Sequence, residues 1–459
     1  MTRRSVINIS VLIFTLTALL LAGFGCKGGS REAQEAAAKA VSLNWWRVGG
    51  SKQNFDILLN DYKKIRPNVS VNVSQIREEE LESALIQALA DGRAPDVVSL
   101  PNTWLRGWQH RLAPLPPTLT LPYLELTGTF KKEPRWVLKE INSLDLKSIK
   151  ARYVDTVVND VYFDSKIYGL PLNLDTLLIF YNVDLLTAAQ FPEAPKTWNE
   201  FKEASQAITK LDKLGRLLQN GAALGTAENI PYSFDIVSAL MLQNGTPMMT
   251  GGSASFQKPI SVQGESYSPG LDALRFYTDF ANPSKETYSW SADQINAREA
   301  FAAGKLGFVF GYWRDLPNLK AMAPKIRIGL ANFPQIEGSF QTSYYANYFI
   351  ETVLKQSTHQ TEAWDLIQFI TTPAEAKKYL ESAKQPTAQR EFVTAQIADE
   401  DLGIPAAQVL TAKTWYRGYD FTSTQSVFQD MIKQVLVGTP IDQALSAAAE
   451  RVTQTMRKP

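Results

Sequence analysis

The sequence predicts an α/β protein with more than one folded lobe, and three observations lead to this. Strand-like and helix-like segments alternate from residue 41 onward. The chain has 459 residues, which is too long for one core at about 100 to 200 residues per domain. Its composition is 45% hydrophobic and 20% charged, so enough apolar surface is available for packed cores, and global disorder is excluded.

The first predicted unit has the order βαβαβ. Residues 41–48 (VSLNWWRV) have the β-rich character of a buried strand, and apolar residues at helical spacing follow up to Pro67. Residues 69–73 alternate as a strand, 81–89 place their apolar side chains on one helix face, and 95–100 form a short buried strand. This order implies a parallel sheet covered by helices, with ligands at the carboxyl ends of its strands.

Later segments continue the alternation. Thr197 and Glu200 bracket a capping box, which marks a helix start. Residues 297–303 read as a helix that leads into a strand at 306–310, and an amphipathic helix is expected near the end of the chain, at 441–452. We find no internal repeat, so a repeat architecture is not expected.

Charge and composition exclude several functions. Lys plus Arg (47) nearly equal Asp plus Glu (46), so no broad basic surface is available for nucleic acid. One Cys and two His exclude a disulfide scaffold and a Cys/His metal site. Residues 49–51 (GGS) lack the spacing of a dinucleotide fingerprint, and no Walker sequence occurs. We therefore expect neither a metal nor a cofactor.

The first 40 residues indicate export. Arg3 and Arg4 precede an apolar run over 6–22, and small residues lead to Cys26, the order of a secretory signal. The small residues before Cys26 resemble a bacterial lipobox, although Gly23 stands where Leu is usual. The resemblance implies a signal peptide over 1–25 and a lipid on Cys26. A retained anchor helix and an incidental thiol are the alternatives. Residues 26–40 would then be a flexible tether.

Five fragments, in this order and spacing, together resemble one protein family. They are YKKIRPNVSV (62–71), ALADGRAPDVV (88–98), YGLP with FYNVDLL (168–186), PKTWNEF (195–201) and FAAGK with GYW (301–313). The pattern is similar to the extracytoplasmic solute-binding proteins of ABC importers, in particular the large type that binds sugars. The resemblance spans most of residues 41–456.

The resemblance implies a two-lobe, periplasmic-binding-protein-like (type II) α/β fold with a hinge and an interlobe cleft. The two apparent crossovers put 41–172 and 311–345 in an N-terminal lobe, and 173–310 and 346–459 in a C-terminal lobe. The resemblance further implies a monomeric, extracytoplasmic, lipid-anchored protein. Such a protein carries a small-molecule solute to an ABC permease and has no enzymatic activity. Closure of the cleft around the solute is the expected mechanism.

A sugar site needs aromatic platforms with polar side chains at their edges, because a sugar ring has an apolar face and a hydroxyl rim. Candidates lie at strand ends, crossovers and loops: Trp46, Arg47, Asn102, Trp104, Asp175, Trp290, Tyr312, Trp313, Tyr345 and Trp415. Strand alternation places Trp45 in the core instead. Each aromatic candidate has core packing as its alternative, and Asp175 has bonding to backbone N–H groups of the crossover.

Two other functions stay open. An exported glycoside hydrolase also combines aromatic platforms with carboxylates, but the sequence shows no nucleophile elbow and no His-Glu-x-x-His helix. A sugar sensor without a permease would have the same binding fold. Turnover of a glycoside would distinguish the enzyme, whereas a binding protein returns its sugar intact.

Overall fold

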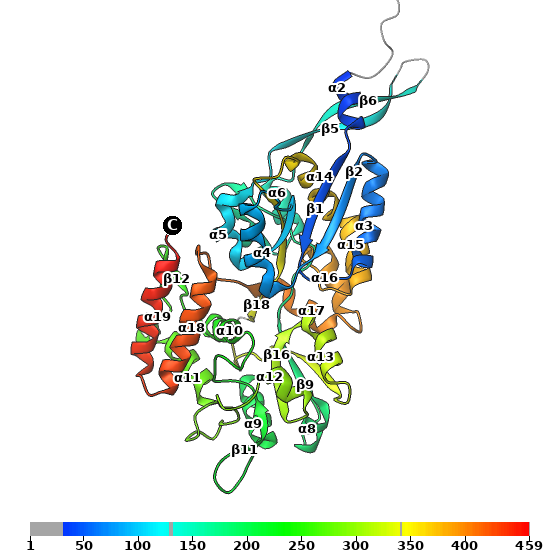
Figure 1. Cartoon of the computed structure of the whole chain (residues 1–459). Coiled ribbons are helices and arrows are strands. Elements are labelled where there is room, and N and C mark those ends of the chain that lie inside the picture. Colours follow the sequence, from blue (N-terminus) through cyan, green and yellow to red (C-terminus); the bar gives the residue numbers. More distant parts are fainter. Residues whose placement is uncertain (1–30, 128–131, 340–341, 459) are drawn as a thin grey trace, which may run out of the picture.

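The computed structural model describes residues 31–127, 132–339 and 342–458. They form two α/β lobes, one above the other in Figure 1, each with its own five-stranded sheet and hydrophobic core. The N-terminal lobe comprises residues 31–174 and 346–412, and the C-terminal lobe comprises 177–345 and 415–458. Within these described ranges, no helix has the length and apolar character needed to cross a bilayer.

The sheet of the N-terminal lobe has the order β2-β1-β3-β19-β4. Its strands are β1 (Val41–Arg47), β2 (Val69–Gln75), β3 (Val97–Pro101), β4 (Leu112–Ala113) and β19 (Phe349–Leu354). β1 pairs in parallel with both β2 and β3. α3 (Lys52–Ile65) connects β1 to β2, and α4 (Glu78–Ala90) connects β2 to β3, so the predicted βαβαβ unit is confirmed. Every residue of β3 and β19 is buried because helices cover both faces.

The sheet of the C-terminal lobe has the order β10-β11-β16-β9-β17. Its strands are β9 (Leu177–Asn182), β10 (Lys210–Leu211), β11 (Leu217–Ala222), β16 (Leu306–Tyr312) and β17 (Ile328–Asn332). The capping box at Thr197 and Glu200 begins α9 (Trp198–Ile208), as predicted. The predicted terminal helix is α19 (Ile441–Thr455), which packs beside α18 (Phe421–Leu436).

Shorter elements complete each lobe. The N-terminal lobe also contains η1 (Asn102–Trp104), α5 (Leu105–Trp108), η2 (Gln109–Arg111), α6 (Leu146–Arg152), α7 (Asp155–Val161), β7 (Tyr162–Phe163), β8 (Lys166–Ile167), α14 (Gln360–Ile370), α15 (Pro373–Ala383), α16 (Arg390–Ile397), α17 (Gly403–Gln408) and η4 (Val409–Thr411). The C-terminal lobe contains α8 (Val183–Ala188), α10 (Ser233–Gln243), β12 (Met249–Thr250), β13 (Ser253–Ala254), β14 (Ile260–Val262), β15 (Glu265–Tyr267), α11 (Pro269–Asp279), α12 (Ala297–Ala302), η3 (Trp313–Asp315) and α13 (Leu316–Met322).

Three chain segments join the lobes and lie side by side. Thr176, on the first segment, forms an antiparallel bridge with Ala346 on the second. β18 (Tyr344–Tyr345), on the second, pairs in parallel with β20 (Ala412–Lys413) on the third. These three adjacent segments form the hinge between two separately packed cores.

The hinge corrects the lobe boundaries expected from sequence. Residues 311–345 do not join the N-terminal lobe, because β17 pairs with β9 in the other sheet. Gly311 lies within β16, which leads directly into η3 and α13 of the C-terminal lobe. Nor do residues 346–459 all belong to the C-terminal lobe, since β19 pairs with β3 and the third crossing comes only at β20. Local sequence patterns do not reveal which sheet a strand joins.

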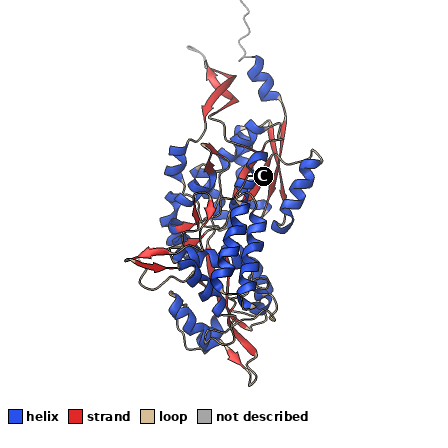
Figure 2. Ribbon diagram, turned by 90° about the vertical axis from the view of Figure 1, so that its left-hand side faces the viewer, coloured by secondary structure: helices blue, strands red, loops and turns tan. Residues whose placement is uncertain are grey.

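A long hairpin, called the arm below, extends from the N-terminal lobe at the end far from the other lobe (Figures 1 and 2). It consists of β5 (Thr118–Thr127) and β6 (Glu133–Asn142). α2 (Arg31–Ala38) packs against it. The prediction of a flexible tether over 26–40 is therefore wrong for residues 31–38, because their Ala-rich sequence has high helix propensity and buries Ala33 and Ala37. The predicted signal peptide and Cys26 lie outside the described residues.

Candidate functional site

A large pocket lies between the two lobes, with a volume of about 910 Å³. Its N-terminal wall comes from α4, η1, α5 and η2, and its C-terminal wall from the start of α18 and the end of α19. The lining residues used below are Glu82, Trp104, Trp108, Arg111, Tyr419, Asp420, Phe421, Arg451, Arg457 and Lys458. Pockets of roughly 300–1,000 Å³ are typical of small-molecule sites.

The position of this pocket follows from the sheets. β1 and β3 run in parallel, so their carboxyl ends meet at one edge, and η1 begins directly after β3. In the other lobe, Asp420 accepts a hydrogen bond from the backbone N–H of Ser423 at 2.9 Å and so caps the start of α18. The pocket thus combines a sheet edge of one lobe with a helix start of the other.

Aromatic rings from both lobes line the pocket. Trp104 is half-buried and packs against the cores of both lobes. The ring of Trp108 stacks on it, with centroids 6.4 Å apart and planes 13° apart, and this contact holds the orientation of Trp104. Tyr419 and the largely buried Phe421 line the pocket from the C-terminal lobe. Flat apolar surfaces of this kind suit a ring with C–H groups on its face.

Charged groups of both signs surround these rings. Glu82 and Asp420 supply carboxylates, and Arg111 lies over the ring of Trp108, with its guanidinium carbon 5.1 Å from the ring centroid. Arg451 is held by an exposed ion pair with Asp430. Arg457 and Lys458 add two further basic groups to the lining, so basic side chains outnumber the two carboxylates. Such groups can bind hydroxyls as donors and acceptors.

A second interlobe pocket of about 660 Å³ lies at α7 and β20. Its lining comprises Asp155, Thr156, Asn159, Thr342, Leu410, Thr411, Ala412, Lys413, Thr414 and Arg417. No aromatic ring is among them. The larger pocket therefore offers the better site for a ligand with apolar ring faces.

Trp104 is the one residue among the ten sequence candidates that lines the large pocket. Trp46 is half-buried at the end of β1 and packs at the margin of the N-terminal core. Asn102 is buried and donates from its amide nitrogen to the carboxylate of Asp160 at 3.1 Å. Its position at the strand end was predicted, but its side chain faces the interior.

Arg47 is buried, contrary to its expected position in the cleft. Its guanidinium forms an ion pair with Glu351 of β19 and donates to the hydroxyl of Tyr379 at 2.9 Å. Trp45 is buried in the core, as predicted, and its indole N–H donates to Glu351 at 2.7 Å. Alternate residues of a strand share a face. The core position of Trp45 therefore already predicts that Arg47, two positions later, points into the same core.

Three aromatic candidates are buried in the C-terminal lobe. Trp290 is fully buried, and its indole N–H donates to the side-chain oxygen of Asn229 at 3.1 Å. Trp415 donates to the hydroxyl of Ser238 at 2.9 Å and packs against Phe234. Tyr345 is fully buried beside the same phenylalanine. Trp290 and Tyr345 have no exposed surface and Trp415 is 6% exposed, because all three pack into the core of the C-terminal lobe.

Asp175 lies on the first crossing segment of the hinge, and Tyr312 and Trp313 lie beside the hinge at the junction of β16 and η3. The carboxylate of Asp175 is buried and accepts hydrogen bonds from the backbone N–H groups of Trp313 and Arg314, both at 3.0 Å. This is the backbone-anchoring role that the sequence left as its alternative. Trp313 is half-buried, and its indole N–H donates to the carbonyl of Lys384 in the N-terminal lobe at 2.6 Å. Trp313 therefore bridges the lobes.

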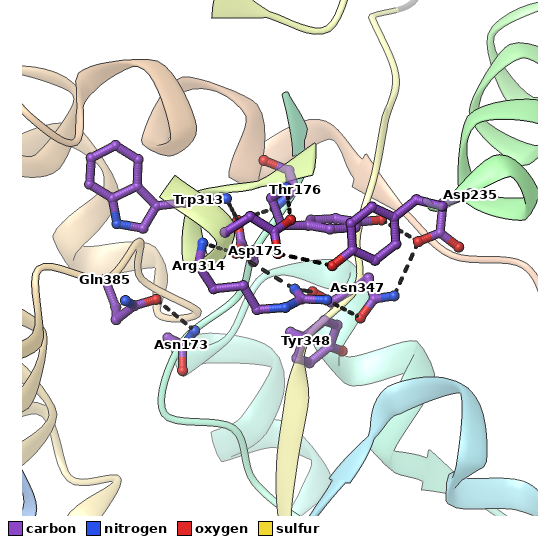
Figure 3. Close-up of polar contacts among 12 residues, drawn as sticks. Asn173, Asp175, Thr176, Asp235, Trp313, Arg314, Asn347, Tyr348 and Gln385 are labelled. Carbon is purple, nitrogen blue, oxygen red and sulfur yellow. Dashed lines mark hydrogen bonds and ion pairs between the residues drawn. The ribbon is translucent and has the colours of Figure 1, made fainter. Parts of the chain in front are cut away.

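A chain of polar contacts continues from Asp175 across the hinge (Figure 3). The guanidinium of Arg314 donates to the carbonyl and the side-chain oxygen of Asn347, at 2.7 and 3.0 Å. The amide nitrogen of Asn347 donates to Asp235 at 3.1 Å, and the hydroxyl of Tyr312 donates to the same carboxylate at 2.6 Å. These contacts tie the second crossing segment to the C-terminal lobe.

Residues 58–402 match the family model described as bacterial extracellular solute-binding protein. The chain belongs to this family. The two lobes and the three-strand hinge of this solute-binding protein agree with the fold that the sequence predicts.

Named relatives are distant. The solute-binding protein is 26% identical over 278 residues to the galactooligosaccharide-binding protein of Bacillus subtilis, covering 60% of each chain. It is 22% identical over 255 residues to the arabinooligosaccharide-binding protein of the same organism, covering 52% of this chain and 51% of that one. The chain thus spans between half and two thirds of the length of these curated relatives.

Solved structures share the fold over nearly the whole length. A solute-binding protein of an ABC transporter from Thermotoga lettingae, bound with α-D-tagatose, matches with a TM-score of 0.67 at 19% identity, covering 91% of this chain and 100% of that one. A cyclo/maltodextrin-binding protein complexed with maltotetraose matches at 0.65 and 16% identity, covering 92% and 98%.

Sequence reasoning missed most of the pocket. Trp108 lies four residues after Trp104, one helical turn, and that spacing was a usable signal. In the sequence, Glu82 follows Glu78, Glu79 and Glu80 near a helix start, a pattern typical of a solvated helix face and not of a ligand site. Tyr419 and Phe421 lie shortly after Trp415, where a loop carries the chain from core to pocket. No local pattern shows that this loop faces α5 of the other lobe.

The buried carboxyls of the hinge predict a pH effect on stability. Burial, opposed by Arg314, raises the pKa of Asp175 to about 6, and burial raises that of Asp235 to about 6. Each carboxyl therefore holds its proton to higher pH in the folded state than in the unfolded state. Protonation of each carboxyl therefore contributes roughly 3 kcal/mol to the free energy of unfolding. This contribution is complete below pH ~4 and is lost as the pH rises through 6.

Asp235→Asn removes one of these titrations. We expect the variant to gain stability relative to the unaltered protein between pH 4 and pH 7, by up to roughly 3 kcal/mol. Urea unfolding at pH 4, 5, 6 and 7 measures the difference. Asp442→Asn, at an exposed position of α19, is the matched control and should give a profile parallel to that of the unaltered protein. A parallel profile for Asp235→Asn would contradict the assignment.

Proposed function

We propose that this protein captures a neutral sugar or oligosaccharide outside the cytoplasm and delivers it to the membrane subunits of an ABC importer. The observation that carries the proposal is the interlobe pocket, with Trp104 and Trp108 on one wall and Tyr419 and Phe421 on the other. The relatives named for galactooligosaccharide and arabinooligosaccharide binding support a sugar of more than one unit.

Capture would work by closure of the two lobes. Because each wall of the pocket belongs to a different lobe, a solute that contacts both walls binds the closed arrangement better than an open one. The solute shifts the equilibrium by that difference in affinity. The three adjacent strands of the hinge allow the rotation, and a permease would recognise the closed form.

The function involves binding and release of an unchanged solute. The family consists of solute-binding proteins, and binding requires only the rings and polar groups of the pocket. Glu82 and Asp420 then accept hydroxyl hydrogen bonds and do not act as a catalytic pair. Recovery of the oligosaccharide intact after prolonged incubation is expected, and its hydrolysis would favour the glycosidase interpretation instead.

The proposal includes a lipid anchor that holds the protein at the membrane. The apolar run at 6–22 and the small residues before Cys26 support an exported chain that is cut at Cys26 and carries a lipid there. Mass spectrometry of the N-terminal peptide from bacterial membranes tests this. A diacylglyceryl modification on Cys26 is expected, and an uncut leader would contradict it.

A ligand panel tests the sugar assignment. At a concentration of 100 times Kd, a bound ligand stabilises the folded protein by roughly 2.7 kcal/mol. We expect at least one neutral oligosaccharide to raise the melting temperature by a few degrees. The panel should contain galacto-, arabino- and malto-oligosaccharides, with peptides and phosphate esters as controls. A shift with a peptide or phosphate ester and with no sugar would contradict the proposal.

A further inference from the structure

The arm has one face that is apolar and exposed. Strand register places residues of even number in β5 opposite residues of even number in β6, on the same face. In the outer half of the arm this face pairs Pro122 with Leu138, Leu124 with Trp136, and Leu126 with Pro134. Leu124, Leu126 and Leu138 are 58%, 66% and 39% exposed. We call these six residues the apolar arm face.

The inner half of the same face is different. There Thr118 pairs with Asn142 and Thr120 with Glu140, which is the polar pattern expected of a sheet face in water. The opposite face of the arm is the one that packs: Leu119 and Leu121 belong to the N-terminal core. The change from polar to apolar along one face is therefore not explained by folding of the lobe.

The chain itself indicates what covers this face. α2 packs against both strands of the arm and begins at Arg31, so the first described residue of the chain belongs to a helix held against the arm. Four residues lie between Cys26 and Arg31, and the five residue-to-residue steps from one to the other span at most about 18 Å. A membrane anchor at Cys26, or at the apolar run before it, holds the bilayer close to the arm.

The composition of the face fits a lipid surface. Exposed apolar patches commonly mark sites of membrane or protein contact, and Trp is favoured at the boundary between headgroups and acyl chains. Pro122 and Pro134 lack backbone N–H groups, which disfavours addition of a further strand from a second copy at the arm edges. Lys132, the residue before β6, is exposed, and its long side chain can reach lipid headgroups.

We infer that the apolar arm face rests in the surface of the lipid bilayer, as a second membrane contact beside the N-terminal anchor. The inference rests on the proposed function in one respect, namely membrane anchoring near Cys26. Two contacts restrict rotation of the anchored protein and set the direction of its cleft relative to the membrane. The arm lies at the end of the N-terminal lobe farthest from the C-terminal lobe (Figure 1), so the C-terminal lobe is held away from the bilayer.

The test uses the full chain, isolated from bacterial membranes and reconstituted in phosphatidylethanolamine and phosphatidylglycerol vesicles. A nitrobenzoxadiazole (NBD) label is placed at Leu126→Cys on the apolar arm face. Lys139→Cys, on the opposite arm face, and Leu218→Cys, at a 63% exposed position of the C-terminal lobe, are matched controls. The unaltered chain, treated with the same label, corrects for reaction at Cys26. Flotation with the vesicles is measured first for every variant.

We expect the label at position 126 to emit at shorter wavelength and to be quenched severalfold more by spin-labelled lipid than the labels at 139 and 218. A chain that floats while all three labels stay in water overturns the inference and leaves solute binding untouched. Disulfide-linked dimers through position 126, without lipid quenching, assign the face to a second copy and also overturn it. A chain that does not float contradicts the anchoring proposal as well. Oligosaccharide binding, measured on the same samples, is expected to be unchanged in every variant.

Discussion

Glu351→Ala is expected to lower the free energy of unfolding by about 3–5 kcal/mol, because it leaves the guanidinium of Arg47 buried without its counter-charge. Glu351 is fully buried on β19. Besides the ion pair with Arg47, its carboxylate accepts hydrogen bonds from the indole of Trp45 at 2.7 Å and the hydroxyl of Ser99 at 2.6 Å. All three donors lose their acceptor together.

Urea unfolding of the purified protein measures this loss. Glu125→Ala, which breaks the exposed ion pair between Glu125 and Lys139 on the arm, is the matched control and should cost at most about 1 kcal/mol. The double change Arg47→Met with Glu351→Leu should recover much of the loss, since it removes both charges. Equal, small losses for Glu351→Ala and Glu125→Ala would show that the buried pair does not stabilise the lobe.

Trp104→Ala is expected to weaken oligosaccharide binding by about 30- to 1,000-fold, which corresponds to roughly 2–4 kcal/mol. The ring of Trp104 is the half-buried aromatic surface of the N-terminal wall, and it packs against both lobe cores. Its removal takes away the apolar platform for a sugar face and a contact that accompanies closure. Both losses act on the bound, closed state.

Titration calorimetry with the oligosaccharide identified by the panel gives the affinity. Trp136→Ala, on the arm, removes an indole that is also half-buried and should leave binding unchanged. Melting temperatures of both variants without ligand separate an effect on folding from an effect on binding. Wild-type affinity for Trp104→Ala would place the sugar elsewhere, with the pocket at α7 and β20 as the next site to test.

Sequence-based prediction succeeded where short-range spacing decides the structure. The βαβαβ order, the capping box at Thr197 and the terminal helix follow from residues one to four positions apart, and the structure has all three. The core position of Trp45 followed from strand alternation. The family resemblance rests on the same local fragments, which explains why the matched family model agrees with it.

Prediction of the site was far less complete. An aromatic residue at a strand end can face the core or the cleft, and the same pattern describes Trp104, which lines the pocket, and Trp46, which packs at the margin of the N-terminal core. Asp175 has the position of a cleft residue but bonds backbone groups of η3. Whether such a side chain faces the pocket or the interior depends on packing partners more than a hundred residues away in the chain.

By itself, the sequence determined the class of fold, the family and an apolar N-terminal segment, because these depend on composition and on spacing within single helices and strands. Only the tertiary structure decided which lobe β17 and β19 join, that Arg47 faces Glu351, and that α18 of one lobe faces α5 of the other. These outcomes depend on contacts between distant segments, whose free energies exist only once both segments are folded.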